Sequence, residues 1–347
     1  MSYSIGIQTI RLQGSPRLAH TEYCDHYPLV RHVTGLDPII DREYAWSKFY
    51  ENWDYDFLWN TNIGPLPWKA RGRVTDMGHA EFMENGIDRR DPVTSPFKSA
   101  EEIYEFDAVE EYGLIDFFEL INYYETLYQK SRNNFPDLVC TGGYYQTLIS
   151  GAIESFGWDL LLEAAADKKR FDKVLEGFFQ QTLHHVRAWA KTSIEVFIQH
   201  DDMVWSSGPF MNPAFYKQSI FPRYKKLWQV LHEAGKLVLF CSDGNFSLFI
   251  DDIAEAGADG FIFEPLTDLD LVIQKYGKTK VIIGSNVDCR TLTFGTTRDI
   301  KKEIDLTIPL AKECPGFIFA IGNHIPANIP VENALFYMDY LRSQWTR

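Results

Sequence analysis

The chain has 347 residues, 45% of them hydrophobic, and its 34 Lys and Arg against 48 Asp and Glu give a formal net charge of −14. This negative charge makes nucleic acids and anionic membranes poor partners. No apolar stretch reaches the ~20 residues of a membrane span, and the N-terminus lacks the basic and apolar regions of a signal peptide. Five irregularly spaced cysteines are typical of reduced thiols, so we expect a cytoplasmic protein.

The first 150 residues show weak periodicity. Residues 55–60 are typical of a short strand, and 71–79 of a turn-bearing excursion such as a hairpin. Apolar spacing predicts a helix over 116–130, and residues 137–143 form a short apolar run broken by glycines. We expect an irregular N-terminal extension over about residues 1–50.

From residue 150 the pattern is clearer. Apolar residues at intervals of three and four predict helices over 160–190 and from Asn212 to Gly235, and shorter ones over 246–256, 268–276 and 297–312. Between the helices lie short apolar runs without alternation, which are typical of strands covered on both faces. These predicted strands are residues 193–198, 236–240, 260–263, 281–284 and 316–320.

Alternating strands and helices favour a parallel sheet, either doubly wound or closed into a barrel. A doubly wound nucleotide-binding sheet usually carries a glycine-rich turn after its first strand, and G-x-G-x-x-G is absent. Polar residues instead follow strand after strand, as expected where all strand ends converge on one face. The chain is therefore predicted to be a single (β/α)8 TIM barrel over residues 1–347 with an N-terminal elaboration.

The polar residues after the strands are the candidates for chemistry. Any one Asp or Asn among them could equally serve a turn or cap a helix, but a thiol, carboxylates and imidazoles at consecutive strand ends indicate a site. Their donor types suit Zn2+, although no spacing typical of a metal motif is present. G-x-S-x-G and Walker A motifs are absent as well. The candidates are His200, Asp201, Asp202, Cys241, Asp243, Asn245, Glu264, Asn286, Asp288, Asn323 and His324.

Several of these residues also carry a family resemblance. In order over residues 190–340, the chain resembles the uroporphyrinogen decarboxylase superfamily, whose fold is a TIM barrel. That superfamily includes true decarboxylases and methyltransferases that act with corrinoid proteins. The resembling segments are Ile198-Gln199-His200-Asp201-Asp202, 207–213, 221–226, Phe240-Cys241-Ser242-Asp243-Gly244-Asn245, 284–288, 322–326 and 330–333.

Two differences between this sequence and the family's motifs help to distinguish the branches of this superfamily. True decarboxylases resemble one another in an N-terminal arginine-rich signature that grips substrate carboxylates, and residues 15–20 show no such signature. The thiol-methylating branch carries a zinc site of the form His-x-Cys and a later Cys, where this chain has Cys241-x-Asp243 and Asn323. Loss of the soft thiolates removes what a zinc–thiolate acceptor site needs.

The resemblance therefore implies a methyltransferase of the first O-demethylase type, which moves a methyl group from a methoxylated substrate to the Co(I) of a corrinoid protein. An aromatic substrate is favoured by the 15% aromatic content. A decarboxylase, a methylamine donor and an inactive scaffold are the alternatives. Homodimerisation and Zn2+ binding stay open. We expect Asp243, His200 and Asp202 to be catalytic, Asn245, Asn286, Tyr145, Trp205 and Phe210 (with Trp59) to hold the substrate, and Cys241, Glu264 and His324 to be the metal ligands.

Overall fold

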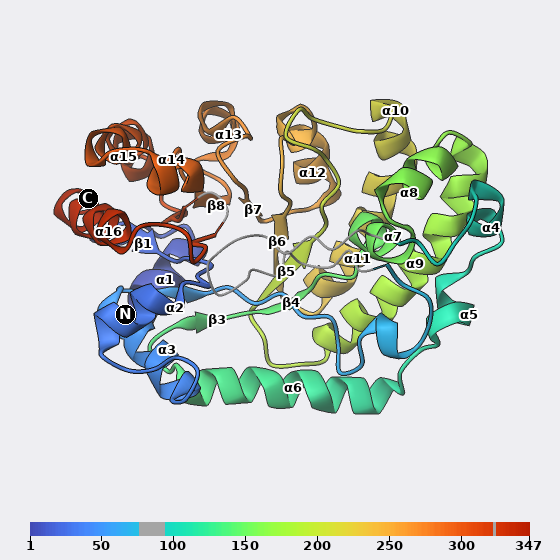
Figure 1. The fold of residues 1–347 in the computed structure, drawn as a ribbon, viewed down its shortest axis with the longest axis horizontal. Coiled ribbons are helices and arrows are strands. Elements are labelled where there is room, and N and C mark those ends of the chain that lie inside the picture. Colours follow the sequence, from blue (N-terminus) through green and yellow to red (C-terminus); the bar gives the residue numbers. More distant parts are fainter. Residues whose placement is uncertain (76–93, 322–323) are drawn as a thin grey trace.

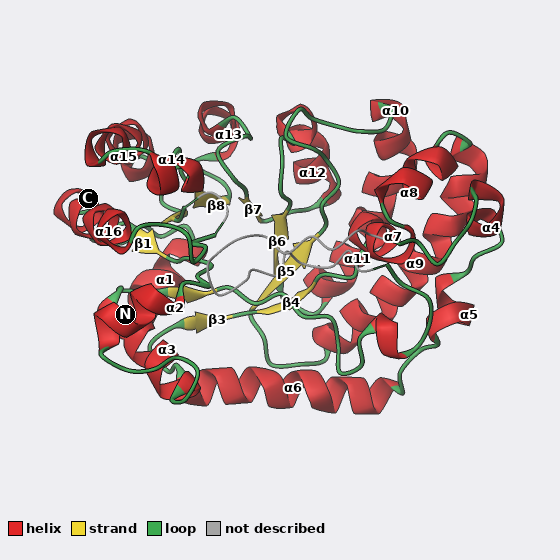
Figure 2. Cartoon of the chain, viewed as in Figure 1, coloured by secondary structure: helices red, strands yellow, loops and turns green. Residues whose placement is uncertain are grey.

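The computed structural model describes residues 1–75, 94–321 and 324–347. Its strands are short and all parallel, and they form the centre of a ring of helices (Figure 1, Figure 2). Hydrogen-bonded neighbours run in the order β1-β9-β8-β7-β6-β5-β4, and β2 pairs with β3. The strands are β1 (Ala19–His20), β2 (Phe57–Leu58), β3 (Val139–Cys140), β4 (Gly142–Tyr144), β5 (Val196–His200), β6 (Leu237–Cys241), β7 (Gly260–Ile262), β8 (Val281–Gly284) and β9 (Phe317–Phe319).

The two sets of paired strands close into one barrel. Strands β3 and β4 are separated by one residue, so a single extended segment pairs with β2 at its start and with β5 at its end. At the remaining seam, the Asp56 N–H donates to the His20 carbonyl at 2.9 Å. The predicted (β/α)8 barrel is therefore confirmed, with β3 and β4 sharing one strand position among the described residues.

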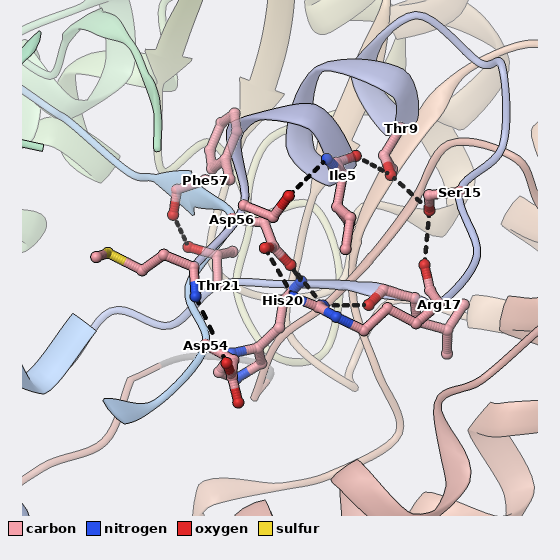
Figure 3. Close-up of polar contacts among 12 residues, drawn as sticks. Ile5, Thr9, Ser15, Arg17, His20, Thr21, Asp54, Asp56 and Phe57 are labelled. Carbon is pink, nitrogen blue, oxygen red and sulfur yellow. Dashed lines mark hydrogen bonds and ion pairs between the residues drawn. The ribbon is translucent and has the colours of Figure 1, made fainter. Parts of the chain in front are cut away.

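A network of buried polar groups fastens this seam between β1 and β2 (Figure 3). Arg17 donates to both carboxylate oxygens of Asp56, at 2.6 and 2.9 Å, and Asp56 also accepts the His20 N–H. The Thr21 hydroxyl donates to the Phe57 carbonyl at 2.7 Å. The seam thus replaces a long backbone ladder with side-chain hydrogen bonds.

The amino-terminal end of the barrel is covered by α1 (Tyr3–Ile10), whose Ile10 joins the apolar cluster inside the barrel. Gly6 allows this close approach, because a Cβ there would lie 2.2 Å from the Asp56 carbonyl oxygen. The N-terminal region was expected to be irregular. It instead holds α1, the barrel strand β1, α2 (Tyr27–Thr34) and α3 (Arg42–Asn52).

The other helices surround the barrel (Figure 2). The helix predicted over 116–130 is α6 (Phe117–Asn134), and the one predicted over 160–190 is divided into α8 (Trp158–Ala165) and α9 (Lys168–Ala190), with Asp167 capping the second. Of the predicted excursion 71–79, residues 76–79 lie outside the described residues, and 71–75 contain no strand. The remaining helices are α4 (Ala100–Tyr104), α5 (Ala108–Tyr112), α7 (Leu148–Phe156), α10 (Pro213–Phe215), α11 (Phe221–Glu233), α12 (Ile250–Ala256), α13 (Leu269–Tyr276), α14 (Cys289–Phe294), α15 (Thr297–Lys312) and α16 (Val331–Gln344).

Apolar side chains fill two separate layers. One cluster lies inside the barrel and includes Val196, Ile198, Leu239 and Ile283, and a larger cluster lies between the strands and the helices. Most of the aromatic residues belong to the outer cluster. Among the described helices, none combines the length and apolarity required to cross a membrane.

Candidate functional site at the carboxyl end of β5 and β6

Strand alternation explains how three of the predicted catalytic residues come together. Val196 and Ile198 face the barrel interior, and His200 is the next residue on that face of β5. Leu239 and Cys241 likewise face inward on β6, and Cys241 is the register partner of His200. Two residues beyond each of these positions lie Asp202 and Asp243, at the mouth of the barrel.

His200, Asp202 and Asp243 form a compact cluster, which we call the mouth triad. One ligand-type atom from each residue lies within 4.8 Å of the others. The His200 Nε2 is 3.0 Å from the Asp202 Oδ1, which also accepts the Asp243 backbone N–H at 3.1 Å. Tyr145, another predicted site residue, donates its hydroxyl to the Asp202 Oδ2 at 3.1 Å. Asp202 therefore joins the triad to the end of β4.

Burial and crowding of charge shift the pKa values in this cluster. Asp243 is exposed at the mouth but surrounded by protein, and desolvation and the negative charges of Asp202 and Glu264 raise its pKa to about 7. Burial acts against the charged form of His200, but the acidic groups Cys241 and Asp202 outweigh it and raise the pKa of His200 well above its usual value. Burial also raises the pKa of the Cys241 thiol, which disfavours its thiolate, so Asp202 is the stronger anionic partner of His200.

The neighbouring carboxylate Asp201 has a different task. Its Oδ1 accepts the N–H groups of Ile149 and Ser150 in the first turn of α7, and its Oδ2 accepts the Tyr224 hydroxyl. These bonds, all between 2.6 and 2.9 Å, hold the backbone after β5 in place. Asp201 thus fixes the loop from which Asp202 projects.

The loop after β6 is held from two sides. Gly244, at φ 81°, packs so closely on the Trp205 carbonyl that a Cβ would lie 2.7 Å from it, and its N–H donates to Glu264 at 2.7 Å. Asn245 also donates its N–H to the Trp205 carbonyl, at 2.9 Å. These contacts place Asp243 beside the loop that carries Trp205.

Aromatic side chains stand beside this loop. Trp158, Trp205 and Phe210 form an aromatic trio with ring centroids 5.1–5.6 Å apart. Trp205 and Phe210 were predicted from the sequence and Trp158 was not, because it begins a helix rather than following a strand. On another part of the chain, Tyr23 contacts the rings of Trp59 and His324, each at 6.1 Å.

The residues expected to bind a metal do not meet in the mouth triad. Cys241 lies against the His200 ring, but Glu264 uses one carboxylate oxygen to hold Gly244, and His324 packs on Tyr23. Among the described residues, the cluster with metal-ligand geometry is the mouth triad itself. Its imidazole and carboxylate donors fit a borderline cation such as Zn2+.

Other predicted polar residues serve local structure. The Asn245 Oδ1 accepts the Ser247 N–H at 3.1 Å, and Asp288 caps α14. Asn286 donates its N–H to Thr307 and is half-buried. Asn323 lies outside the described residues. Substrate binding by Asn245 and Asn286 remains a prediction.

Fold and site together define a (β/α)8-barrel protein with an ionisable cluster where such barrels carry their chemistry. The family model for uroporphyrinogen decarboxylase (URO-D) matches residues 124–344. The chain therefore belongs to the uroporphyrinogen decarboxylase family, as its sequence resemblance indicated.

Curated relatives are distant and match only in part. A uroporphyrinogen decarboxylase of Thermus thermophilus is 24% identical over 170 residues, 49% of this chain and 48% of the relative, and that of Carboxydothermus hydrogenoformans is 27% identical over 129 residues, 37% of this chain and 36% of the relative. The match thus spans about half the length of the relatives or less. A solved methyltransferase from Methanosarcina mazei is 15% identical, covers 99% of both chains and superimposes with a TM-score of 0.70, which shows a shared fold.

Proposed function

We propose that this protein transfers a methyl group from a methoxylated aromatic compound to the cobalt of a corrinoid protein. The observation that carries the proposal is the mouth triad, which gathers His200, Asp202 and Asp243 at the end of the barrel where substrates bind in this fold. The methyltransferase from Methanosarcina mazei, similar in fold along the whole chain, supports this branch of the family.

Methyl transfer from a methoxy group requires activation of a poor leaving group, the methoxy oxygen. The methyl carbon–oxygen bond breaks as cobalt(I) accepts the methyl group, and negative charge develops on the departing oxygen. That oxygen must receive a proton or contact a cation. The mouth triad offers His200 and Asp243, two groups whose pKa values are raised, for this task, and the Tyr145 hydroxyl orients Asp202 beside them.

The aromatic trio supplies a surface suited to an aryl ring. Offset and edge-on packing against Trp158, Trp205 and Phe210 would bury the ring. The packing of Gly244 on the Trp205 carbonyl, and the N–H that Asn245 donates to it, bring the Trp205 loop next to the triad. A methylamine would use little of this surface, so we favour the aryl donor.

A decarboxylase acting on a polycarboxylate needs cations that face its substrate. Arg17, the arginine in the N-terminal segment 15–20, makes a two-pronged ion pair with Asp56 at the β1–β2 seam. Its guanidinium also lies 4.4 Å from the Trp345 ring centroid. Arg17 is thus engaged in barrel closure, which favours methyl transfer over decarboxylation.

The test is methyl transfer by purified protein. Chemically reduced cob(I)alamin is mixed with the protein and a methoxybenzoate, and parallel reactions contain methylamine or uroporphyrinogen. We expect methylcobalamin absorbance and the matching hydroxybenzoate by mass spectrometry, in equal amounts. Failure of every methyl donor, tried also with corrinoid proteins, would refute the proposal, and carbon dioxide release from uroporphyrinogen would establish the decarboxylase.

A further inference from the structure

Negative charge is in excess around the mouth triad. Asp202 and Glu264 lie close enough to Asp243 to repel its negative charge, and His200, which pairs with Asp202, attracts it. The proposed reaction places further negative charge on an oxygen at this same position. A divalent ion bound among these carboxylates would reverse the sign of the local field and stabilise that oxygen further.

The spacing of the donor atoms suits such an ion. The His200 Nε2 and the Asp202 Oδ1 are 3.0 Å apart, and the Asp243 carboxylate lies within 4.8 Å of both residues' donor atoms. Ligands at the usual zinc bond lengths are roughly 3.3 Å apart in a tetrahedron. Among the described residues, none donates a hydrogen bond to the Asp243 carboxylate. Its side chain can therefore rotate to bring a carboxylate oxygen within ligand distance of the His200 and Asp202 donor atoms.

The groups behind the ligands are already ordered. The Tyr145 hydroxyl holds the Asp202 Oδ2, and the Thr147 hydroxyl donates to the His200 carbonyl at 2.7 Å. The Ser150 hydroxyl accepts the Asp202 N–H at 2.8 Å. Such supporting bonds orient ligands in metal sites and raise their affinity.

We propose that His200, Asp202 and Asp243 bind a divalent first-row metal ion, which we would test first as Zn2+. Three protein ligands leave one position open, as in catalytic zinc sites. If the proposed function holds, that position receives the departing oxygen of the methoxy group. Metal binding by the triad does not itself depend on that function.

The experiment compares the triad with the ligands that the sequence alone suggests. Wild-type protein, His200→Ala and Asp243→Asn form one set, and Cys241→Ser and His324→Ala form the matched control set. Each protein is stripped with a chelator, reloaded with Zn2+ or Co2+, desalted and analysed for metal by mass spectrometry. Circular dichroism and thermal unfolding establish that each variant is folded.

We expect one ion per wild-type and control chain, and at least ten-fold weaker binding by both triad variants. The Co2+ form should lack the near-ultraviolet charge-transfer band of a thiolate ligand. Folded wild-type protein that retains no ion would overturn the inference, as would loss of the ion from the control variants alone. Metal binding without methyl transfer would refute only the proposed function, whereas full methyl transfer by metal-free protein would refute the catalytic role of the ion.

Discussion

The β1–β2 seam and the mouth of the barrel both contain clustered charged groups, but these groups are paired at the seam and crowded with like charges at the mouth. At the seam, Asp56 receives two bonds from Arg17 and one from the His20 backbone (Figure 3). At the mouth, Asp243 faces two other carboxylates and accepts no hydrogen bond from the described residues. Charged groups whose hydrogen bonds are all satisfied, such as Asp56, stabilise the fold. A cluster of carboxylates with an excess of negative charge is instead typical of sites that bind a ligand or take part in a reaction.

The largest expected effect is on stability, at the seam. Arg17→Met leaves Asp56 fully buried without its ionic partner, and we expect unfolding to become easier by about 3–5 kcal/mol. Arg11→Met is the matched control, because its ion pair with Glu195 is exposed and should contribute less than about 1 kcal/mol. Urea denaturation measures both. Equal losses of unfolding free energy in the two variants would show that the seam ion pair stabilises the protein no more than an exposed ion pair does.

At the mouth we expect the reverse pattern. Asp243→Asn should lower methyl transfer at least about 100-fold, in the range found for lost electrostatic stabilisation of a transition state, with little change in unfolding. Asp268→Asn makes the same chemical change in a carboxylate that caps α13, and should retain activity. Steady-state turnover and thermal unfolding are measured for both. If Asp243→Asn had the same turnover as the wild type, a role of Asp243 in the reaction would be excluded.

Two adjacent tyrosines sharpen the comparison further. Tyr145→Phe removes the hydroxyl that holds Asp202 and should reduce kcat about ten-fold, the effect of one hydrogen bond to a charged group. The Tyr144 hydroxyl is buried and has no hydrogen-bond partner among the described residues, so Tyr144→Phe should leave both stability and turnover nearly unchanged. Turnover with the two variants is compared at saturating substrate. Similar losses in both would point to packing rather than to the bond with Asp202.

Much of the barrel follows from the short apolar runs in the sequence, and the alternating direction of side chains along each strand then places the site residues. The apolar residues Val196 and Ile198 set the face on which His200 must lie, and the register with β6 brings Cys241 opposite. Asp202 rather than Asp201 was predicted to be catalytic, but the structural role of Asp201 was not predictable, because it depends on Ile149 and other groups distant in the chain.

Other features were not predicted from the sequence, because the residues that they contact lie far away in the chain. Strand β1 is two residues long and pairs with β9, about 300 residues later, so the N-terminal segment lacks a recognisable strand pattern. The expected metal ligands Glu264 and His324 follow strands as the triad does, and their role as ligands stays a prediction; the contacts of Glu264 with Gly244 and of His324 with Tyr23 were not foreseen. Residue type and strand position alone carry no information about such competing contacts.

The last expected effect concerns Glu154, a half-buried carboxylate in α7 that belongs to neither region. Burial raises its pKa to about 7, although both oxygens accept bonds from Gln146. The folded protein therefore binds a proton that the unfolded chain releases near pH 4.5, and the stability from this group is lost as pH rises to about 7. Glu154→Gln should thus stabilise the protein at pH 8 by about 2–3 kcal/mol relative to its effect at pH 5. Thermal unfolding of both proteins at these pH values measures the difference, and a pH-independent difference would show that Glu154 titrates alike in both states.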